Sequence, residues 1–351
     1  MVDYLIVGLG LAGIAFCERL EQHGKTFVVI NDDSQTSSNI AGGLYNPVIL
    51  KRFSLAWKAG EQMEMVLPFY KALEDKLGES LDFKVPVLRI FASVQEQNLW
   101  FEAADKKKLQ PYLSTKLIPN TNPCLSAPFG FGEVLHTGRV DTKRLAKLYS
   151  GYLSRKKLLH KKTFNFADLK IGTNSLSYRA LSAKRIVFAT GFGLKGNWYF
   201  NYLPLNGTKG ELLTINAPAL KEGSVIKSSV FIIPIGNDHY RVGATYKWKD
   251  KSNEPTSEAR RELQTKLDTF LNCDYKITSH VAGIRPTVAD RRPLLGKHPV
   301  FNHMYVLNGF GSRGVMIAPY ASDQLYQYIE NGRSLDPEMD ISRYEKDYIK
   351  V

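Results

Sequence analysis

The sequence contains few of the residues that would build a disulfide framework, a metal centre or a membrane span. There are only three cysteines in 351 residues, an odd number, and none has the spacing of a metal-binding pair. No apolar run approaches the roughly 20 residues needed to cross a bilayer. The seven histidines are scattered, and no Ser/His/Asp arrangement or catalytic carboxylate pair is evident. We therefore expect a cytoplasmic protein without a metal site or a membrane span.

Acidic residues are also in short supply, since 47 basic residues against 34 acidic ones give a net charge of +13. A basic surface can attract nucleic acid, anionic membranes or small anions. The lysines form only short clusters such as Lys106–Lys108, which favours a solvated surface over a nucleic-acid footprint. The length and the 44% hydrophobic fraction are typical of a soluble protein of one large or two ordinary domains.

Glycine is present where a dinucleotide would need it. Residues 4–30 read as strand, helix and strand, and the turn after the first strand carries G-x-G-x-x-G at Gly8, Gly10 and Gly13. In that context the glycines permit a tight turn, close approach of a pyrophosphate and close packing of helix on strand. A residue ending the second strand holds the adenosine ribose in such sites, and either Asn31 or Asp32 can take that place.

The loop after the second strand favours a flavin over a nicotinamide. Residues 36–47 read TSSNIAGGLYNP, and this small, glycine-rich loop can lie along a pyrophosphate and a ribityl chain without steric conflict. The alternative is an ordinary surface loop. The flavin interpretation adds a short run to the expected cofactor-binding residues: Ala41, Gly42, Gly43 and Leu44.

The middle of the chain predicts a divided architecture. We expect a helix over 54–77 with a kink or break at Pro68, a strand over 85–92, and a helix capped near Asp141 or Thr142. A buried strand over 183–193 enters a second turn with Ala189, Thr190 and Gly191 at the cofactor. Residues 204–249 alternate like an antiparallel sheet, and residues 257–271 form an amphipathic helix. The prediction is a dinucleotide domain of residues 1–50, 135–203 and 280–351, and a substrate domain of residues 51–134 and 204–279.

The stretch NGFGSRGVMIAPYASDQL, residues 308–325, places a glycine-rich, cationic turn before a helix. Such a turn points backbone N–H groups and a positive dipole at an electron-rich group. It adds a second set of expected cofactor contacts: Gly309, Gly311, Ser312, Arg313, Gly314 and Val315.

Together, VGLGLAG, IVFATG, VGAT, GIRPTVADRRPLLG and GFGSRG resemble the FAD-dependent D-amino-acid oxidase and glycine oxidase superfamily. The resemblance covers most of the chain and is weakest over residues 50–135. GSRG and GLYNP are most similar to the oxidase half of the bifunctional enzyme that matures a wobble uridine in tRNA. The resemblance implies an α/β fold, with a glutathione-reductase-like FAD-binding Rossmann domain and an inserted antiparallel-sheet substrate domain. It also implies non-covalent FAD, since no cysteine lies near GIRP.

The resemblance implies roles for individual residues as well. Arg285 would pair with the substrate carboxylate, and Arg313 would act on the flavin or the substrate. Phe164 joins the expected cofactor contacts. Tyr246, Tyr45 and Lys209 are pocket candidates for which packing is the favoured interpretation.

The implied reaction is hydride transfer from an α-carbon to flavin N5, which leaves an imine for hydrolysis. The substrate is a small amino acid or amine, or alternatively the aminoacetate arm of a tRNA base. The electron acceptor and the oligomeric state stay open.

Overall fold

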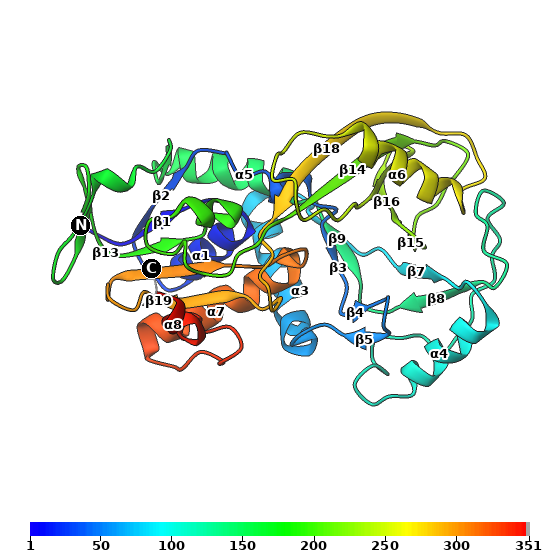
Figure 1. The fold of residues 1–351 in the computed structure, drawn as a ribbon, viewed down its shortest axis with the longest axis horizontal. Coiled ribbons are helices and arrows are strands. Elements are labelled where there is room, and N and C mark those ends of the chain that lie inside the picture. Colours follow the sequence, from blue (N-terminus) through cyan, green and yellow to red (C-terminus); the bar gives the residue numbers. More distant parts are fainter. Residues whose placement is uncertain (349–351) are drawn as a thin grey trace.

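The glycine-rich start of the chain folds into strand, helix and strand, as expected. β1 (Val2–Val7) leads through Gly8–Gly10 into α1 (Leu11–Gln22), and β2 (Phe27–Asn31) returns parallel to β1. The central residues of both strands are buried, as in a parallel sheet covered on both faces. The computed structural model describes residues 1–348, and Figure 1 shows this unit in blue at the left.

An eight-stranded sheet contains this unit. Its hydrogen-bonded order is β10-β2-β1-β13-β12-β11, and β20 pairs with β13 and carries β19. The neighbours from β10 to β13, and β13 with β20, are parallel. The further strands are β10 (Leu159–Lys161), β11 (Leu169–Ile171), β12 (Leu176–Tyr178), β13 (Leu181–Phe188), β19 (Leu294–Lys297) and β20 (Met304–Asn308).

Both faces of this sheet are buried, because successive strand residues point to opposite sides. Tyr4 and Ile6 pack into a core with α1, α3 (Ala59–Leu77), α5 (Thr142–Arg155) and α7 (Gly314–Asn331). Leu5 and Val7 pack into a second core with β11, β12 and the 3-10 helix Gly191–Gly196. The central strands of the sheet therefore lie between two layers of packed side chains.

A seven-stranded sheet forms the other half, on the right of Figure 1. Its order is β18-β14-β17-β16-β15-β7-β8, antiparallel except between β15 and β7. The side chains of Leu263 and Leu267 on α6 (Ser257–Asp268) pack with Leu213 and Ile215 behind it. The strands are β7 (Val87–Ile90), β8 (Phe131–Val134), β14 (Thr208–Asn216), β15 (Val225–Lys227), β16 (Phe231–Gly236), β17 (His239–Gly243) and β18 (Lys276–Arg285).

Most expected elements are present, with corrections at residues 54–77. The helix α3 begins at Ala59, because Ser54–Leu55 form the short strand β5, and Pro68 lies inside one uninterrupted helix. The predicted cap of α5 is present, since the Asp141 side chain accepts a hydrogen bond from the Arg144 backbone N–H at 3.0 Å.

The sheets do not follow the expected domain boundaries everywhere. β18 runs from Lys276 to Arg285 within the seven-stranded sheet and so crosses the boundary expected at residue 280. The helix α3, expected within 51–134, packs against α7 on the eight-stranded sheet. Buried apolar contacts rather than chain order determine which half a segment joins.

The remaining elements are short. They are α2 (Ser37–Ile40), β3 (Leu44–Tyr45), β4 (Val48–Ile49), β5, β6 (Asp82–Phe83), α4 (Val94–Ala104), β9 (Gly138–Val140), α8 (Glu345–Tyr348) and 3-10 turns at Phe166–Asp168 and Ile341–Tyr344. Among residues 1–348, none of the helices combines the length and the apolar character that a membrane span requires.

His298, just after β19, makes stability depend on pH. It is fully buried among aromatic rings, and its Nδ1 accepts the backbone N–H groups of Val300 and Phe301 at 3.1 and 3.2 Å. Burial lowers its pKa to about 4, while an unfolded histidine titrates near about 6.5.

The unfolded chain therefore takes up a proton first as the pH falls. We expect the free energy of unfolding to drop by about 3 kcal/mol between roughly pH 6.5 and pH 4. Urea titrations of wild type and His298→Asn measure this. Asparagine keeps an acceptor for the two N–H groups and does not titrate, so an equal drop in the variant would contradict the assignment.

Candidate functional site

A cavity of about 1100 Å³ opens between the two sheets. It is lined by the carboxyl ends of β1, β2, β13 and β20, by most of residues 37–51, and by one face of the seven-stranded sheet. Ligands of open α/β sheets bind outside the carboxyl ends of the strands. The volume exceeds the roughly 300–1,000 Å³ usual for small-molecule sites, so a dinucleotide and a substrate can share it.

The first glycine turn brings α1 against the sheet. Gly8 has φ +100°, and a Cβ there would lie 2.5 Å from the carbonyl oxygen of Ala189. A Cβ at Gly13 would lie 2.1 Å from the carbonyl oxygen of Gly8, so Gly13 serves packing and does not line the cavity. The first turn of α1 has no acidic residue, and its N–H groups suit an anion.

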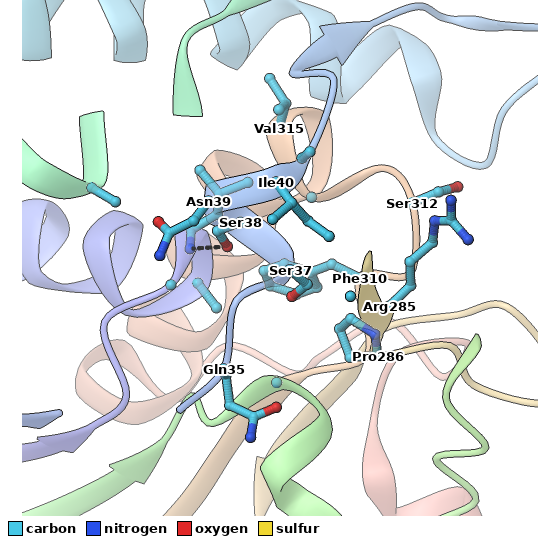
Figure 2. A pocket seen from close by; sticks show the side chains of 18 of the residues that line it. Gln35, Ser37, Ser38, Asn39, Ile40, Arg285, Pro286, Phe310, Ser312 and Val315 are labelled. Carbon is cyan, nitrogen blue, oxygen red and sulfur yellow. Dashed lines mark hydrogen bonds between the residues drawn. The ribbon is translucent and has the colours of Figure 1, made fainter. Parts of the chain in front are cut away.

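The α2 segment supports this turn from the other side. Ser38 Oγ accepts the backbone N–H of Leu11 at 3.2 Å, the dashed line in Figure 2. Asn31 Oδ1 accepts the N–H of Leu9 at 3.0 Å, so Asn31 braces the glycine turn as well as lining the cavity. Burial opposes ionisation of the neighbouring Asp32, but hydrogen bonds from Ser34 and Thr163 outweigh it and lower its pKa. Which of the two holds a ribose stays a prediction.

The other expected cofactor contacts largely converge on the same cavity. Phe164 lines it and stacks on Tyr178 with ring centroids 4.5 Å apart. Gly309 does not line it, because this glycine packs against Leu294. The residues that the structure does bring to the cavity are Gly8, Gly10, Asn31, Asp32, Ala41, Gly42, Gly43, Leu44, Phe164, Ala189, Thr190, Gly191, Gly311, Ser312, Arg313, Gly314 and Val315.

The GFGSRG turn fixes Arg313 at the start of α7. Arg313 is the N-cap residue, and the first turn of the helix has no acidic side chain. Its Nη1 donates to the carbonyl oxygen of Asn46 at 2.9 Å, which ties the turn to the loop of residues 41–47. Burial lowers the pKa of its guanidinium, and no ion pair joins it to an acid within residues 1–348. Arg313 therefore adds positive charge to the cavity wall.

Arg285 ends β18 and turns its side chain across the sheet. Its guanidinium covers Gly210, where a Cβ would lie 2.0 Å from Nη2. Nη1 donates to the carbonyl oxygen of Thr245 at 3.2 Å, and the ring of Tyr246 lies 5.6 Å from the guanidinium carbon. Burial lowers its pKa. No carboxylate in the described part of the chain pairs with it, so it is not an ordinary ion-pair arginine. Figure 2 shows Arg285 beside Ser312, opposite α2.

Of the three pocket candidates Tyr246, Tyr45 and Lys209, only Tyr246 lines the cavity. Tyr246 lines the cavity and is 44% exposed, so it lies at the entrance. Tyr45 is fully buried and donates to Asp82 at 2.8 Å, and Lys209 is buried on the opposite face of β14 against Asp250 and Glu254. Neither Tyr45 nor Lys209 lines the cavity, as the packing interpretation predicted.

Sequence reasoning missed the part of the wall that the seven-stranded sheet provides. Leu212, Lys227, Phe231, Ile233 and Thr245 all line the cavity. Strand alternation in residues 204–249 was visible, but it does not show which face meets a ligand.

The cavity fits FAD on its own features. Gly10 and Gly311 leave space where side chains would intrude, and both helix N-termini lack acidic residues. Thr190 Oγ1 is buried at the wall and has no hydrogen-bond partner in the structure, as expected of a group that a ligand satisfies. The residues around Gly10 would hold the pyrophosphate, and those around Arg313 the electron-rich edge of the flavin.

Comparison with known proteins agrees with this geometry. Glycine oxidase from Pseudomonas aeruginosa is 24% identical over 95% of this chain and 96% of its own length. Among solved structures, glycine oxidase from Geobacillus kaustophilus superposes with a TM-score of 0.77 at 18% identity, covering 98% of this chain and 97% of that one. Iminodiacetate oxidase from Chelativorans has the same TM-score and identity, over 97% and 98% of the two chains. The profile of the FAD-dependent oxidoreductase (DAO) family matches residues 3–327, and the chain belongs to that family.

Proposed function

We propose that the protein oxidises the C–N bond of an amino acid or of a glycine-like secondary amine. The observation that carries this is Arg285, a largely buried cation at the wall of the cavity that no acid of residues 1–348 pairs with. A guanidinium fork matches a carboxylate in two parallel hydrogen bonds, and a buried charge is stable only when it is paired. A substrate carboxylate supplies the missing partner.

The protein residues would bind and orient this substrate. Thr245 fixes one nitrogen of the Arg285 guanidinium, and Gly210 leaves the room that this side chain occupies. Tyr246 would cover the bound carboxylate from the entrance. Bound FAD supplies the two-electron acceptor for the hydride that leaves the α-carbon. The nitrogen loses a proton, and water then hydrolyses the imine to an oxo acid and an amine.

The relatives support this class of substrate. The relatives are named glycine oxidase and iminodiacetate oxidase, and glycine and iminodiacetate are both small amines that bear a carboxylate. None of the three cysteines lines the cavity, which supports non-covalent FAD. We also propose that the eight-stranded sheet with its helices is the FAD-binding domain and the seven-stranded sheet the substrate domain.

Anaerobic bleaching of the bound flavin tests the proposal. Loss of the oxidised flavin band is followed with glycine, sarcosine, D-alanine and D-proline. We expect at least one of them to bleach the flavin within seconds to minutes, because hydride transfer needs only a bound, oriented amine. Bound flavin that none of these compounds, nor any longer N-substituted glycine, reduces would refute the small-molecule proposal.

A second candidate is oxidation of an aminoacetate arm on a tRNA base. It is favoured by the ring of Trp248, which meets that of Tyr246 edge to face with centroids 5.3 Å apart; Tyr246 is 44% and Trp248 46% exposed. Exposed aromatic rings beside a lysine such as Lys249 can stack an unpaired base, worth about 1–3 kcal/mol per base.

If this candidate is right, tRNA carrying the arm bleaches the flavin, and Trp248→Ala weakens tRNA binding by about tenfold or more. Sarcosine should reduce the flavin of this variant as it reduces that of wild type, since Trp248 does not line the cavity. Equal tRNA affinity in wild type and Trp248→Ala would count against the stacking role.

A further inference from the structure

The half of the cavity that lies on the seven-stranded sheet holds a second cation, Lys227. This residue ends β15, is partly buried and lines the cavity. Its Nζ lies 4.6 Å from the centroid of the Phe231 ring and 3.4 Å from the carbonyl oxygen of Ser229. Within residues 1–348 no carboxylate pairs with it.

Two neighbouring cations, Arg89 and Lys266, already engage acids of their own. Arg89 lies opposite Lys227 on the neighbouring strand β7 and forms an ion pair with Glu96 at 2.6 Å. Lys266 on α6 is held by Glu262 at 2.7 Å. Burial lowers the pKa of Lys227 to about 8, and the charges of Arg89 and Lys266 act in the same direction. The ammonium group therefore carries a charge at neutral pH that the protein does not neutralise.

Strand register places Lys227 on the same face of the sheet as the Arg285 site. Leu212 pairs with Gly243, Gly243 with Phe231, and Phe231 with Lys227, so all four residues point to one side. All four line the cavity. Gly210, beneath the Arg285 guanidinium, lies two residues from Leu212 on that face. The two cations are thus at separate ends of one continuous wall.

The wall between the two cations is apolar and long. Three strand-to-strand steps of about 4.8 Å separate Leu212 from Lys227, a distance of about 14 Å between backbones. The surface between them is formed by Leu212, Phe231 and Ile233, with Val48 and Leu50 also lining the cavity. Glycine has one carbon between its amine and its carboxylate and cannot bridge this distance.

We propose that Lys227 binds a second, distal anion of the substrate, and that the substrate class is an elongated N-substituted glycine ending in a carboxylate or a phosphate. This rests on the proposed function, because Arg285 must hold the glycine carboxylate. The apolar wall accommodates the spacer between the two anions. Lys227 is then a specificity-determining residue that selects for length and terminal charge.

Two matched series of N-alkylglycines test the proposal. The members of one series end in a carboxylate, those of the other in a methyl group, and the alkyl chain is lengthened step by step. At the fitting length we expect kcat/KM for anaerobic flavin reduction to be about 10- to 100-fold higher for the charged member. This ratio should fall towards one in Lys227→Met and persist in Lys227→Arg and in Lys276→Met, an exposed lysine of the same sheet outside the cavity.

The ratio should also depend on pH. Deprotonation of Lys227 removes the attraction, so the ratio should decline as the pH rises through about 8. Matched members have nearly the same amine pKa, so the ratio cancels ionisation of the substrate. A ratio of one at every length, or a ratio unchanged in Lys227→Met, overturns the proposal.

Two further arms separate this inference from the proposed function. If neither series reduces the flavin, and glycine, sarcosine, D-alanine and D-proline also fail to reduce it, the proposed function fails. Calorimetric binding of α,ω-dicarboxylates then still tests Lys227, and equal affinity in wild type and Lys227→Met overturns its role.

A comparison of 5-carboxymethylaminomethyluridine with and without a 3′-phosphate as the reductant of the flavin identifies the source of the anion. Preference for the phosphate form, lost in Lys227→Met, assigns a nucleotide phosphate, whereas preference confined to the carboxylate series assigns a free dicarboxylate.

Discussion

Replacing Arg285 with alanine is expected to lower kcat/KM for flavin reduction by about 10²–10³-fold while FAD stays bound. Truncating one partner of a buried, hydrogen-bonded charge pair costs about 2–5 kcal/mol, because the substrate carboxylate enters the cavity without its counter-ion. The loss should be concentrated in binding and orientation of the substrate, since the proposed role of Arg285 is to hold the carboxylate and not to accept the hydride. Anaerobic stopped-flow reduction at several substrate concentrations separates KM from the limiting rate.

Two companion variants sharpen this result. Gly210→Ala places a Cβ 2.0 Å from the present position of Arg285 Nη2, so the guanidinium must move and part of the Arg285→Ala defect should appear. Arg260→Ala, an exposed arginine on α6 outside the cavity, removes the same charge and should behave as wild type. Full activity of Arg285→Ala would show that another group binds the carboxylate.

Gly10→Asp is expected to remove FAD from a protein that still folds. Gly10 is the N-cap of α1, with φ −76° and ψ −169°, and aspartate is among the residues favoured at such positions. A Cβ there would meet only Ser38 Oγ, at 3.1 Å, so this hydroxyl must move by a few tenths of an ångström but no backbone atom is in the way. The aspartate carboxylate would then occupy the place of the pyrophosphate and repel it, weakening FAD binding by about 100-fold or more.

Gly10→Asn is the matched control. Asparagine has nearly the same size and also caps helices, so the difference between the two variants isolates the charge. We expect the asparagine variant to bind FAD markedly better than the aspartate variant, and both to unfold at urea concentrations no lower than the wild-type apoprotein. FAD titration and urea unfolding measure the two quantities. An aspartate variant that retains its flavin would mean that the pyrophosphate lies elsewhere.

Much of the cofactor half could be read from local pattern. Gly8, Gly10 and Gly13 follow a buried strand and precede a helix, and their spacing can be recognised within one short segment. The turn before α7 is similar, since Gly311 and Arg313 are neighbours in the chain as well as at the cavity. Gly309 shows the limit of this approach, because its backbone conformation was foreseeable but its packing against Leu294 was not.

Local sequence could not predict which side chains on the substrate side of the cavity face the ligand. Tyr45 lies between two cavity residues in sequence, yet its side chain points away to Asp82, because neighbours on a strand face opposite sides. Lys209 and Gly210 differ for the same reason, one buried against Asp250 and the other beneath Arg285.

The sequence by itself determined the family and the dinucleotide turn, and its GIRP motif made Arg285 the candidate for binding a carboxylate. Those features depend on residues close together in the chain, whose sterics and hydrogen bonding act over one turn or one strand. Only the tertiary structure decided that no acid within residues 1–348 pairs with Arg285, that Tyr246 lies at the entrance, and that Lys227 lines the same wall. These relations arise from the register of β14 with β18 and of β15 with β7 and β16, pairings between segments distant in sequence that no local pattern specifies.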